Sequence, residues 1–140
     1  MNNESAENMR PRIFHSGISF SIRGGGLNFD EISRTLGVDP DLISQKGKRY
    51  GHRQELCDFD AWYYTTGRRV HRDRPLDEHV TALWEILQPH IKYLRELKKK
   101  FELRILIQVQ SPVCRFTIGQ RCLKLCAELD IPLEICATVS

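Results

Sequence analysis

The chain has 140 residues, of which 41% are hydrophobic and 28% are charged, and its formal net charge is +3. This length suits one domain with its own core, and this composition excludes an intrinsically disordered chain. The charge is too small to demand a polyanionic partner, and no apolar run approaches the roughly 20 residues that span a bilayer, so we expect no membrane and a cytoplasmic location. Residues 1–12 carry little apolar content, and we expect a disordered N-terminal tail before a single domain at residues 13–140.

The first elements are a strand and a helix separated by glycines. Apolar and polar residues alternate from Ile18 to Ile22, which predicts a strand with one buried face. Asn28 and Glu31 then have the spacing of a helix cap, and Gly37 supplies a left-handed stop. This stretch contains the most fully signalled helix of the chain.

The middle of the chain predicts two further strands. Turn-forming residues surround Ser44 to Tyr50, which could form a short edge strand blunted by positive charges. Residues Phe59 to Thr66 are rich in aromatic residues and threonine, a composition typical of a strand, and Gly67 ends it.

A long apolar stripe then predicts a helix that begins near Asp73 and Pro75 and reaches the lysines at 98–100. Pro89 interrupts this pattern. Because a proline inside a helix removes one backbone hydrogen bond and clashes with the preceding turn, we expect a kink or two shorter helices that meet near Gln88.

The last third predicts a strand, a helix and a strand. Alternation from Leu103 to Val109 indicates a strand buried mainly on one side. Thr117 and Gln120 have capping-box spacing before a helical apolar face, and Pro132 leads into a closing strand from Leu133.

This order of elements favours the α+β class. Polar residues alternate with apolar ones in most strands, so we expect a mainly antiparallel sheet with helices on one face, a two-layer sandwich. The first six elements follow the ferredoxin-like βαββαβ order, with a C-terminal αβ unit appended. The helix-free face would then show Ser19, Ser21, Arg104, Leu106 and Gln108.

Several segments together resemble the domain of unknown function family 4279. They are Ser19–Ile22, Leu27–Ile32, Leu36–Pro40, Gly47–Arg49 and Trp62, followed by a C-terminal half with a long helix, an aliphatic strand, a short helix and a closing strand. The resemblance covers roughly residues 15 to 137 and implies a small, mostly bacterial single-domain protein without an assigned activity. It carries over no catalytic residues. At its end the chain has Cys136, Ala137 and Thr138 where an acidic and aromatic ending is expected of the family.

The run from Arg23 to Gly26 lies between a strand and a helix start, where phosphate-binding loops occur. Its spacing fits neither common glycine fingerprint, and Asp30 and Glu31 place negative charge on the helix turn that an anion would occupy. We therefore favour a structural turn that needs unusual backbone angles.

Two basic clusters flank the aromatic strand and form the candidate binding surface. The hairpin cluster precedes the strand and the turn cluster follows it. With Trp62, Tyr63 and Tyr64 between them they could bind single-stranded nucleic acid by charge and stacking, although a solvated loop pair around a core strand explains the same residues. The hairpin cluster is Lys46, Lys48, Arg49, His52 and Arg53, and the turn cluster is Arg68, Arg69, His71, Arg72 and Arg74.

Five cysteines are an odd number, and in a reducing compartment they act as small core hydrophobes. Cys122 and Cys126 are four residues apart and could ligate a metal with Cys114 or Cys136, but no CxxC or HxxxH pair supports this. Spacing alone leaves open a nucleophilic Cys57 or Cys114 beside a histidine. We predict no metal, no cofactor and no catalytic residues.

The leading hypothesis is a small, non-enzymatic binding domain whose partner is another protein or a second copy of itself across the helix-free face. An immunity-type or regulatory role in bacteria is compatible with such a domain. The alternative is single-stranded nucleic-acid binding through the two basic clusters. An enzyme is the least favoured reading, because no catalytic constellation stands at informative spacing.

Overall fold

The computed structural model describes residues 15–49, 55–112 and 116–139. These residues form five strands and several helices, which confirms the α+β class predicted from the sequence. The predicted tail lies outside the described residues. In chain order the elements are β1 (His15–Gly24), α2 (Phe29–Leu36), β2 (Leu42–Ser44), β3 (Asp60–Thr65), the 3₁₀ turn η1 (Thr66–Arg68), α3 (Leu76–Leu87), the 3₁₀ turn η2 (Gln88–His90), α4 (Ile91–Lys98), β4 (Glu102–Ser111), α5 (Gln120–Leu129) and β5 (Leu133–Val139).

The strands form one mixed sheet in the order β2-β3-β1-β4-β5. β1 pairs antiparallel with β3 and with β4, and β2 pairs antiparallel with β3. β5 is parallel to β4, because α5 carries the chain back to the same end of the sheet. β2 and β5 are therefore the two edge strands.

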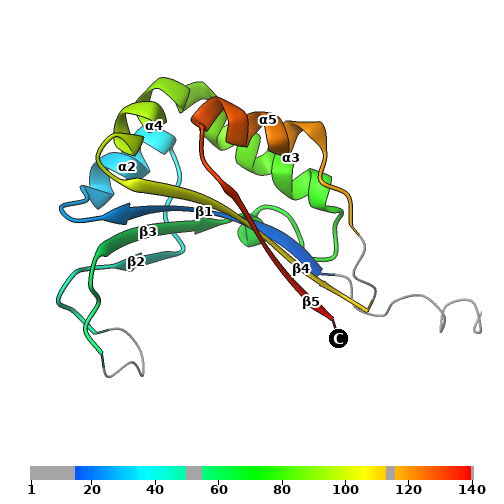
Figure 1. Ribbon diagram of the computed structural model, residues 1–140, viewed down its shortest axis with the longest axis horizontal. Helices are drawn as coiled ribbons and strands as arrows, with labels where there is room; N and C mark the ends of the chain where they lie inside the picture. The colour runs from blue at the N-terminus through cyan, green and yellow to red at the C-terminus, as the bar shows by residue number, and fades with distance from the viewer. Residues whose placement is uncertain (1–14, 50–54, 113–115, 140) are drawn as a thin grey trace, which may run out of the picture.

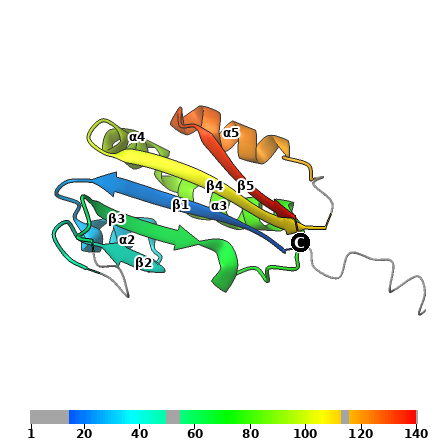
Figure 2. The same ribbon diagram turned by 60° about the horizontal axis from the view of Figure 1, so that its bottom comes forward.

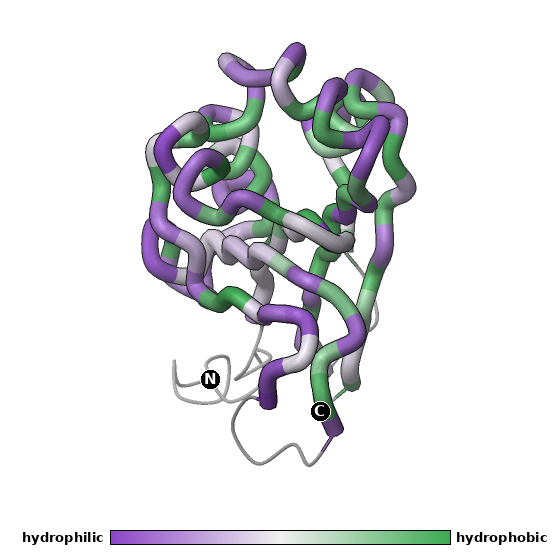
Figure 3. The backbone as a smooth tube through the Cα atoms, turned by 90° about the vertical axis from the view of Figure 1, so that its left-hand side faces the viewer, coloured by the Kyte–Doolittle hydropathy of each residue, from purple (hydrophilic) through white to green (hydrophobic). Residues whose placement is uncertain are grey.

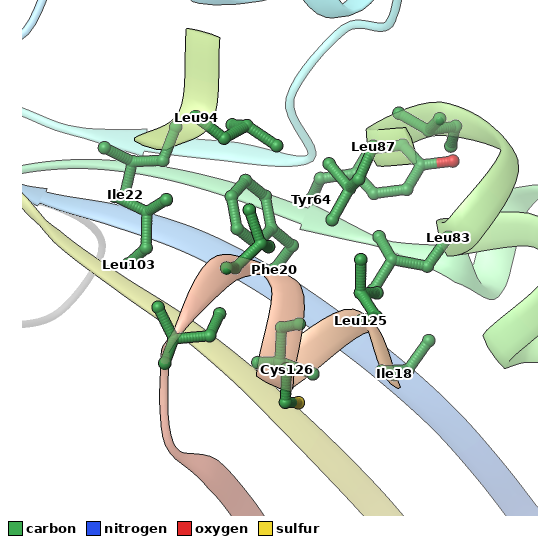
Figure 4. Close-up of a cluster of buried hydrophobic side chains, with 14 of the residues drawn as sticks. Ile18, Phe20, Ile22, Tyr64, Leu83, Leu87, Leu94, Leu103, Leu125 and Cys126 are labelled. Carbon is green, nitrogen blue, oxygen red and sulfur yellow. The ribbon is translucent and has the colours of Figure 1, made fainter. Parts of the chain in front are cut away.

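The helices lie on one side of this sheet, as Figures 1 and 2 show from two directions. Along the tube in Figure 3, hydrophobic and hydrophilic stretches alternate within the helices, as expected of elements that bury one side only. The core fills the space between the helices and the facing side of the sheet. Figure 4 shows part of it, with Phe20 and Ile22 of β1 among leucines from α3, α4 and α5.

Helix α2 follows the local signals in its sequence. The side chain of Asn28 accepts a hydrogen bond from the N–H of Glu31 at 3.1 Å, and Gly37 adopts a left-handed conformation with φ of 72°. Leu27 and Ile32, at the two positions of a hydrophobic staple, are both buried.

The predicted break at Pro89 is confirmed. Helix α3 ends at Leu87, the 3₁₀ turn η2 contains the proline, and α4 begins at Ile91. At the start of α3, Pro75 is the cap residue and makes no side-chain cap hydrogen bond.

Two boundaries differ from the predictions. The edge strand β2 ends at Ser44, where the sequence predicted it to begin, because the N–H of Lys46 donates to the Asp60 carboxylate instead of continuing the ladder. Helix α5 begins at Gln120 with Gly119 as its cap, so the predicted capping role of Thr117 is wrong. An added Cβ on Gly119 would lie 2.8 Å from Asp77 Oδ1, so packing against α3 shapes this helix start.

Candidate binding site

The glycine turn after β1 is closed by a carboxylate of the chain itself. Asp60 Oδ2 accepts the backbone N–H groups of Gly26 at 2.9 Å and Leu27 at 3.2 Å, while Oδ1 accepts that of Lys46 at 2.8 Å. These three hydrogen bonds, with that of Lys46 the strongest cause, lower the pKa of Asp60. The amide donors of Gly26 and Leu27 are thus occupied, which supports the structural reading of this turn.

The basic residues that the sequence singled out divide between the two ends of β3. Lys46, Lys48 and Arg49 are exposed in the connection before β3, and Arg53 lies outside the described residues. The turn cluster follows η1, where Arg68, Arg69, Arg72 and Arg74 are all exposed. A six-residue strand, about 20 Å long, therefore separates the two clusters.

Part of the turn cluster is neutralised by acidic neighbours. Arg68 Nε lies 2.9 Å from Asp41 Oδ1, and Arg74 forms a two-pronged pair with Glu78 on the first turn of α3. The positive potential of this region is consequently smaller than a count of its arginines indicates.

Trp62 and Tyr64, named above as possible stacking residues, both lie in the core, as the alternative interpretation of a core aromatic strand expects. Trp62 is 0% exposed and donates its indole N–H to Ser33 Oγ at 3.1 Å. Its ring stacks on that of Tyr64 with centroids 6.3 Å apart. The physical reason is the parity of β3, which turns these two residues toward the helices and leaves Tyr63 on the opposite face.

The cysteines of α5 are core residues, as the sequence favoured. Cys122 and Cys126 lie on the buried face of α5, where the hydrogen bond that the Cys126 thiol donates to Cys122, together with burial, raises the pKa of the Cys126 thiol. Among the residues that the structure describes, no group of three or more His, Cys, Asp or Glu side chains could hold a metal ion. Cys114 lies outside them.

A pocket of about 590 Å³ opens on the helix-free side of the sheet, at its β2 end. Its floor is formed by Arg23 of β1, Ser44 of β2 and Tyr63 of β3, and its wall by residues 55–59. Backbone hydrogen bonds from Gly47 to Cys57 and from Cys57 to Lys48 hold this wall in place. The helix-free face is therefore overhung at this end by the chain itself.

Arg23 is the central polar group of the pocket. Its guanidinium carbon lies 4.2 Å from the ring centroid of Phe59, a cation–π contact that fixes the plane of the side chain. Its Nε atom is buried and has no hydrogen-bond partner among the described residues. Among the described residues that form the wall of this pocket, the only charged side chains are those of Glu55 and Asp58, which are both exposed.

This pocket could not be found from the sequence. In the sequence Arg23 stands out only as a neighbour of the glycines, and Phe59 only as the predicted start of a strand. They meet because the register places Arg23 beside Ala61 on β3, two residues after Phe59. No local pattern encodes that register.

The rest of the helix-free face is mostly polar, and the strand parity places the five expected residues on it, although Ser21 is only 8% exposed there. Arg104 bridges Glu102 at 2.7 Å and Glu134 at 3.3 Å across β4 and β5. Ser19, Leu106 and Gln108 lie on the same face, opposite the buried Ile105 and Ile107 in the alternation of β4.

The β5 edge is the most exposed strand of the sheet. Every residue from Ile135 to Val139 is exposed, and these two apolar side chains are 47% and 63% exposed. Glu134 is the one charged residue of β5, and Arg104 already pairs with it. β5 lacks the lysines and prolines that commonly protect a sheet edge.

Together, these features define a small α+β domain with a five-stranded mixed sheet, a pocket at one edge and an unprotected strand at the other. The chain belongs to the family described as Domain of unknown function (DUF4279), whose model matches residues 14–140. No curated protein and no solved structure matches it. Among the described residues, no helix has both the length and the apolar character that crossing a membrane requires.

Proposed function

We propose that the protein is a non-enzymatic interaction domain that pairs with a second copy of itself through the β5 edge. In this proposal the domain is a two-layer sandwich with a ferredoxin-like core, to which α5 and β5 are added. β5 forms the edge of the sheet, and its outer side is not paired with another described strand. The observation that carries the proposal is the edge strand β5, whose residues from Ile135 to Val139 are all exposed and uncharged. An immunity-type or regulatory role is compatible with such a domain.

A second copy fits this edge better than an unrelated strand because antiparallel pairing about a twofold axis is self-complementary. If the axis passes through Cys136, all seven residues of β5 are paired. Ile135 then faces Ala137 of the other copy, and Leu133 faces Val139, so apolar side chains meet on the helix side. Glu134 faces Thr138, and no two carboxylates oppose each other.

The pairing would also lengthen the sheet to ten strands with a continuous helix-free face. Such a face could in turn bind a further protein partner, as the hypothesis of a protein-binding helix-free face proposes. The free thiols of the described cysteines support a reducing, cytoplasmic location.

The oligomeric state tests the proposal. We expect light scattering after gel filtration to give twice the chain mass of 16.3 kDa at about 100 μM protein, and Ile135→Lys to give the single mass. Leu42→Lys is the matched control, since Leu42 is a 52% exposed apolar residue on the other edge strand. A monomeric wild type, or equal behaviour of the two variants, would refute the β5 interface.

The register has its own test. Opposed residues in antiparallel strands have Cα atoms about 4.5–5.5 Å apart, within the range that a disulfide spans. Mild oxidation should therefore cross-link the wild type and Cys57→Ser into dimers, and Cys136→Ser should lose the cross-link. A cross-link that survives in Cys136→Ser would place the interface elsewhere.

The nucleic-acid alternative keeps one of its three stacking residues, because Tyr63 lies on the helix-free face while Trp62 and Tyr64 are buried. Its remaining support is the exposed charge of the two clusters. A purified protein with a high absorbance ratio at 260 to 280 nm, or salt-dependent filter binding of single-stranded RNA, would restore it.

A further inference from the structure

The pocket at the β2 end of the sheet carries chemistry that self-association through β5 does not use. Its volume of about 590 Å³ falls in the range of small-molecule sites, about 300–1,000 Å³. It lies at the opposite edge of the sheet from β5, and none of its lining residues belongs to β5.

The floor of the pocket offers a fixed cation. The guanidinium of Arg23 is held against the Phe59 ring, and its buried Nε–H has no acceptor among the described residues. A guanidinium donor of this kind suits a carboxylate, which can accept two parallel N–H groups. Ser44 and Tyr63 line the same pocket, and each has a hydroxyl group that can donate and accept hydrogen bonds.

The wall of the pocket has the opposite charge. Glu55 and Asp58 are exposed carboxylates, so the described lining carries one positive and two negative groups. This balance disfavours a simple polyanion such as phosphate, because the wall would repel it. A simple cation, on the other hand, would leave Arg23 without an acceptor.

A ligand that carries both charges satisfies both parts of the pocket. We propose that this pocket binds a small zwitterion of the amino-acid type, with its carboxylate on Arg23, its ammonium group toward Glu55 and Asp58, and its side chain against Leu56. The volume accommodates a single amino acid or a dipeptide.

Binding can be followed by the amide NMR signals of the isotope-labelled full chain. The probes are leucine, phenylalanine, glutamine and arginine, each beside its carboxamide and its N-acetyl derivative, with inorganic phosphate as a further probe. We expect at least one amino acid to shift the signals of Arg23, Tyr63 and residues 55–59. Its carboxamide and N-acetyl forms should bind at least about tenfold more weakly, because each lacks one charge-assisted interaction.

Two variants connect the binding to Arg23. Arg23→Gln should weaken binding of the same amino acid by at least about tenfold. Arg104→Gln, a change on the same sheet face but outside the pocket lining, should retain wild-type affinity. Far-ultraviolet circular dichroism verifies that both variants are folded.

The proposal is overturned if none of the four amino acids shifts these signals at 10 mM, if the shifts map elsewhere, or if phosphate or the N-acetyl derivatives bind as tightly. The Ile135→Lys variant separates this result from that of the β5 interface. It should bind the amino acid as the wild type does, whatever its oligomeric state.

Discussion

Acidification should destabilise the protein through His79, a histidine that is 0% exposed on α3. Its Nε2 lies 3.2 Å from the carbonyl oxygen of His71 and its Nδ1 lies 2.6 Å from Thr66 Oγ1. The carbonyl can only accept, so Nε2 carries the proton and Nδ1 accepts from the Thr66 hydroxyl. Thr66 Oγ1 in turn accepts the N–H of Ile18 at 3.3 Å. The neutral imidazole completes this network.

Protonation would disrupt that arrangement. A proton on Nδ1 would point at Thr66 Oγ1, which already accepts a backbone donor, and the charged ring would be buried. Burial is the main cause that lowers the pKa of His79 below 6.5, against the opposing effects of the His71 carbonyl and of Glu78.

The sign of the pH effect follows from proton linkage. In the unfolded chain the histidine has a pKa near 6.5, so below this pH the unfolded state binds more protons than the folded state. The stabilisation is complete above about pH 6.5 and is lost as the pH falls toward the lowered folded pKa. One proton sets an upper limit of about 1.4 kcal/mol per pH unit on this loss.

Urea unfolding followed by circular dichroism at pH 5.5, 6.5 and 7.5 measures this loss of stability. We expect the free energy of unfolding of the wild type to fall by up to about 1.4 kcal/mol more than that of His79→Gln between pH 7.5 and 5.5. Glutamine can donate to the same carbonyl and accept from the same hydroxyl without titrating. His90→Gln, which changes a histidine at the α3–α4 break, is the matched control for the substitution itself. Parallel pH profiles for the wild type and His79→Gln would refute the reasoning.

Three other changes test the packing and the turns. Asp60→Asn removes the charge that accepts three backbone N–H groups, so it should lower the free energy of unfolding at pH 7 by about 1–2 kcal/mol. Because the pKa of Asp60 is lowered, this difference from wild type should shrink as the pH falls through that pKa. A constant difference down to pH 2.5 would contradict this account. Gly24→Ala should lower the free energy of unfolding in urea by about 1–3 kcal/mol, since its Cβ would lie 2.6 Å from Phe101 Cδ1 at a φ of +156°. Gly25→Ala, with open space at its Cβ, should lower it by less. Equal losses of stability in the two variants would argue against the clash. Leu83→Ala should cost about 2–5 kcal/mol because Leu83 is 0% exposed in the core, and a thermal midpoint unchanged from wild type would contradict that packing.

The sequence determined those elements whose signals are local. The cap at Asn28 and the left-handed Gly37 fix both ends of α2 within ten residues. Pro89 breaks the long helix wherever that helix packs, because its ring cannot supply the missing backbone donor. Alternation in β1 and β4 likewise fixed which residues share a face, since neighbouring side chains on a strand point in opposite directions.

Tertiary structure decided everything that depends on strands far apart in the chain. The alternation of β3 offers an aromatic residue to each face, and the pairing of β3 with β1 decided that Trp62 lies in the core and Tyr63 on the opposite face. The same register brought Arg23 and Phe59 into one pocket. The end of β2 was set by the Asp60 carboxylate, which accepts a donor from 14 residues earlier. Such contacts form only when distant segments meet, and a local pattern contains no record of which segments these will be.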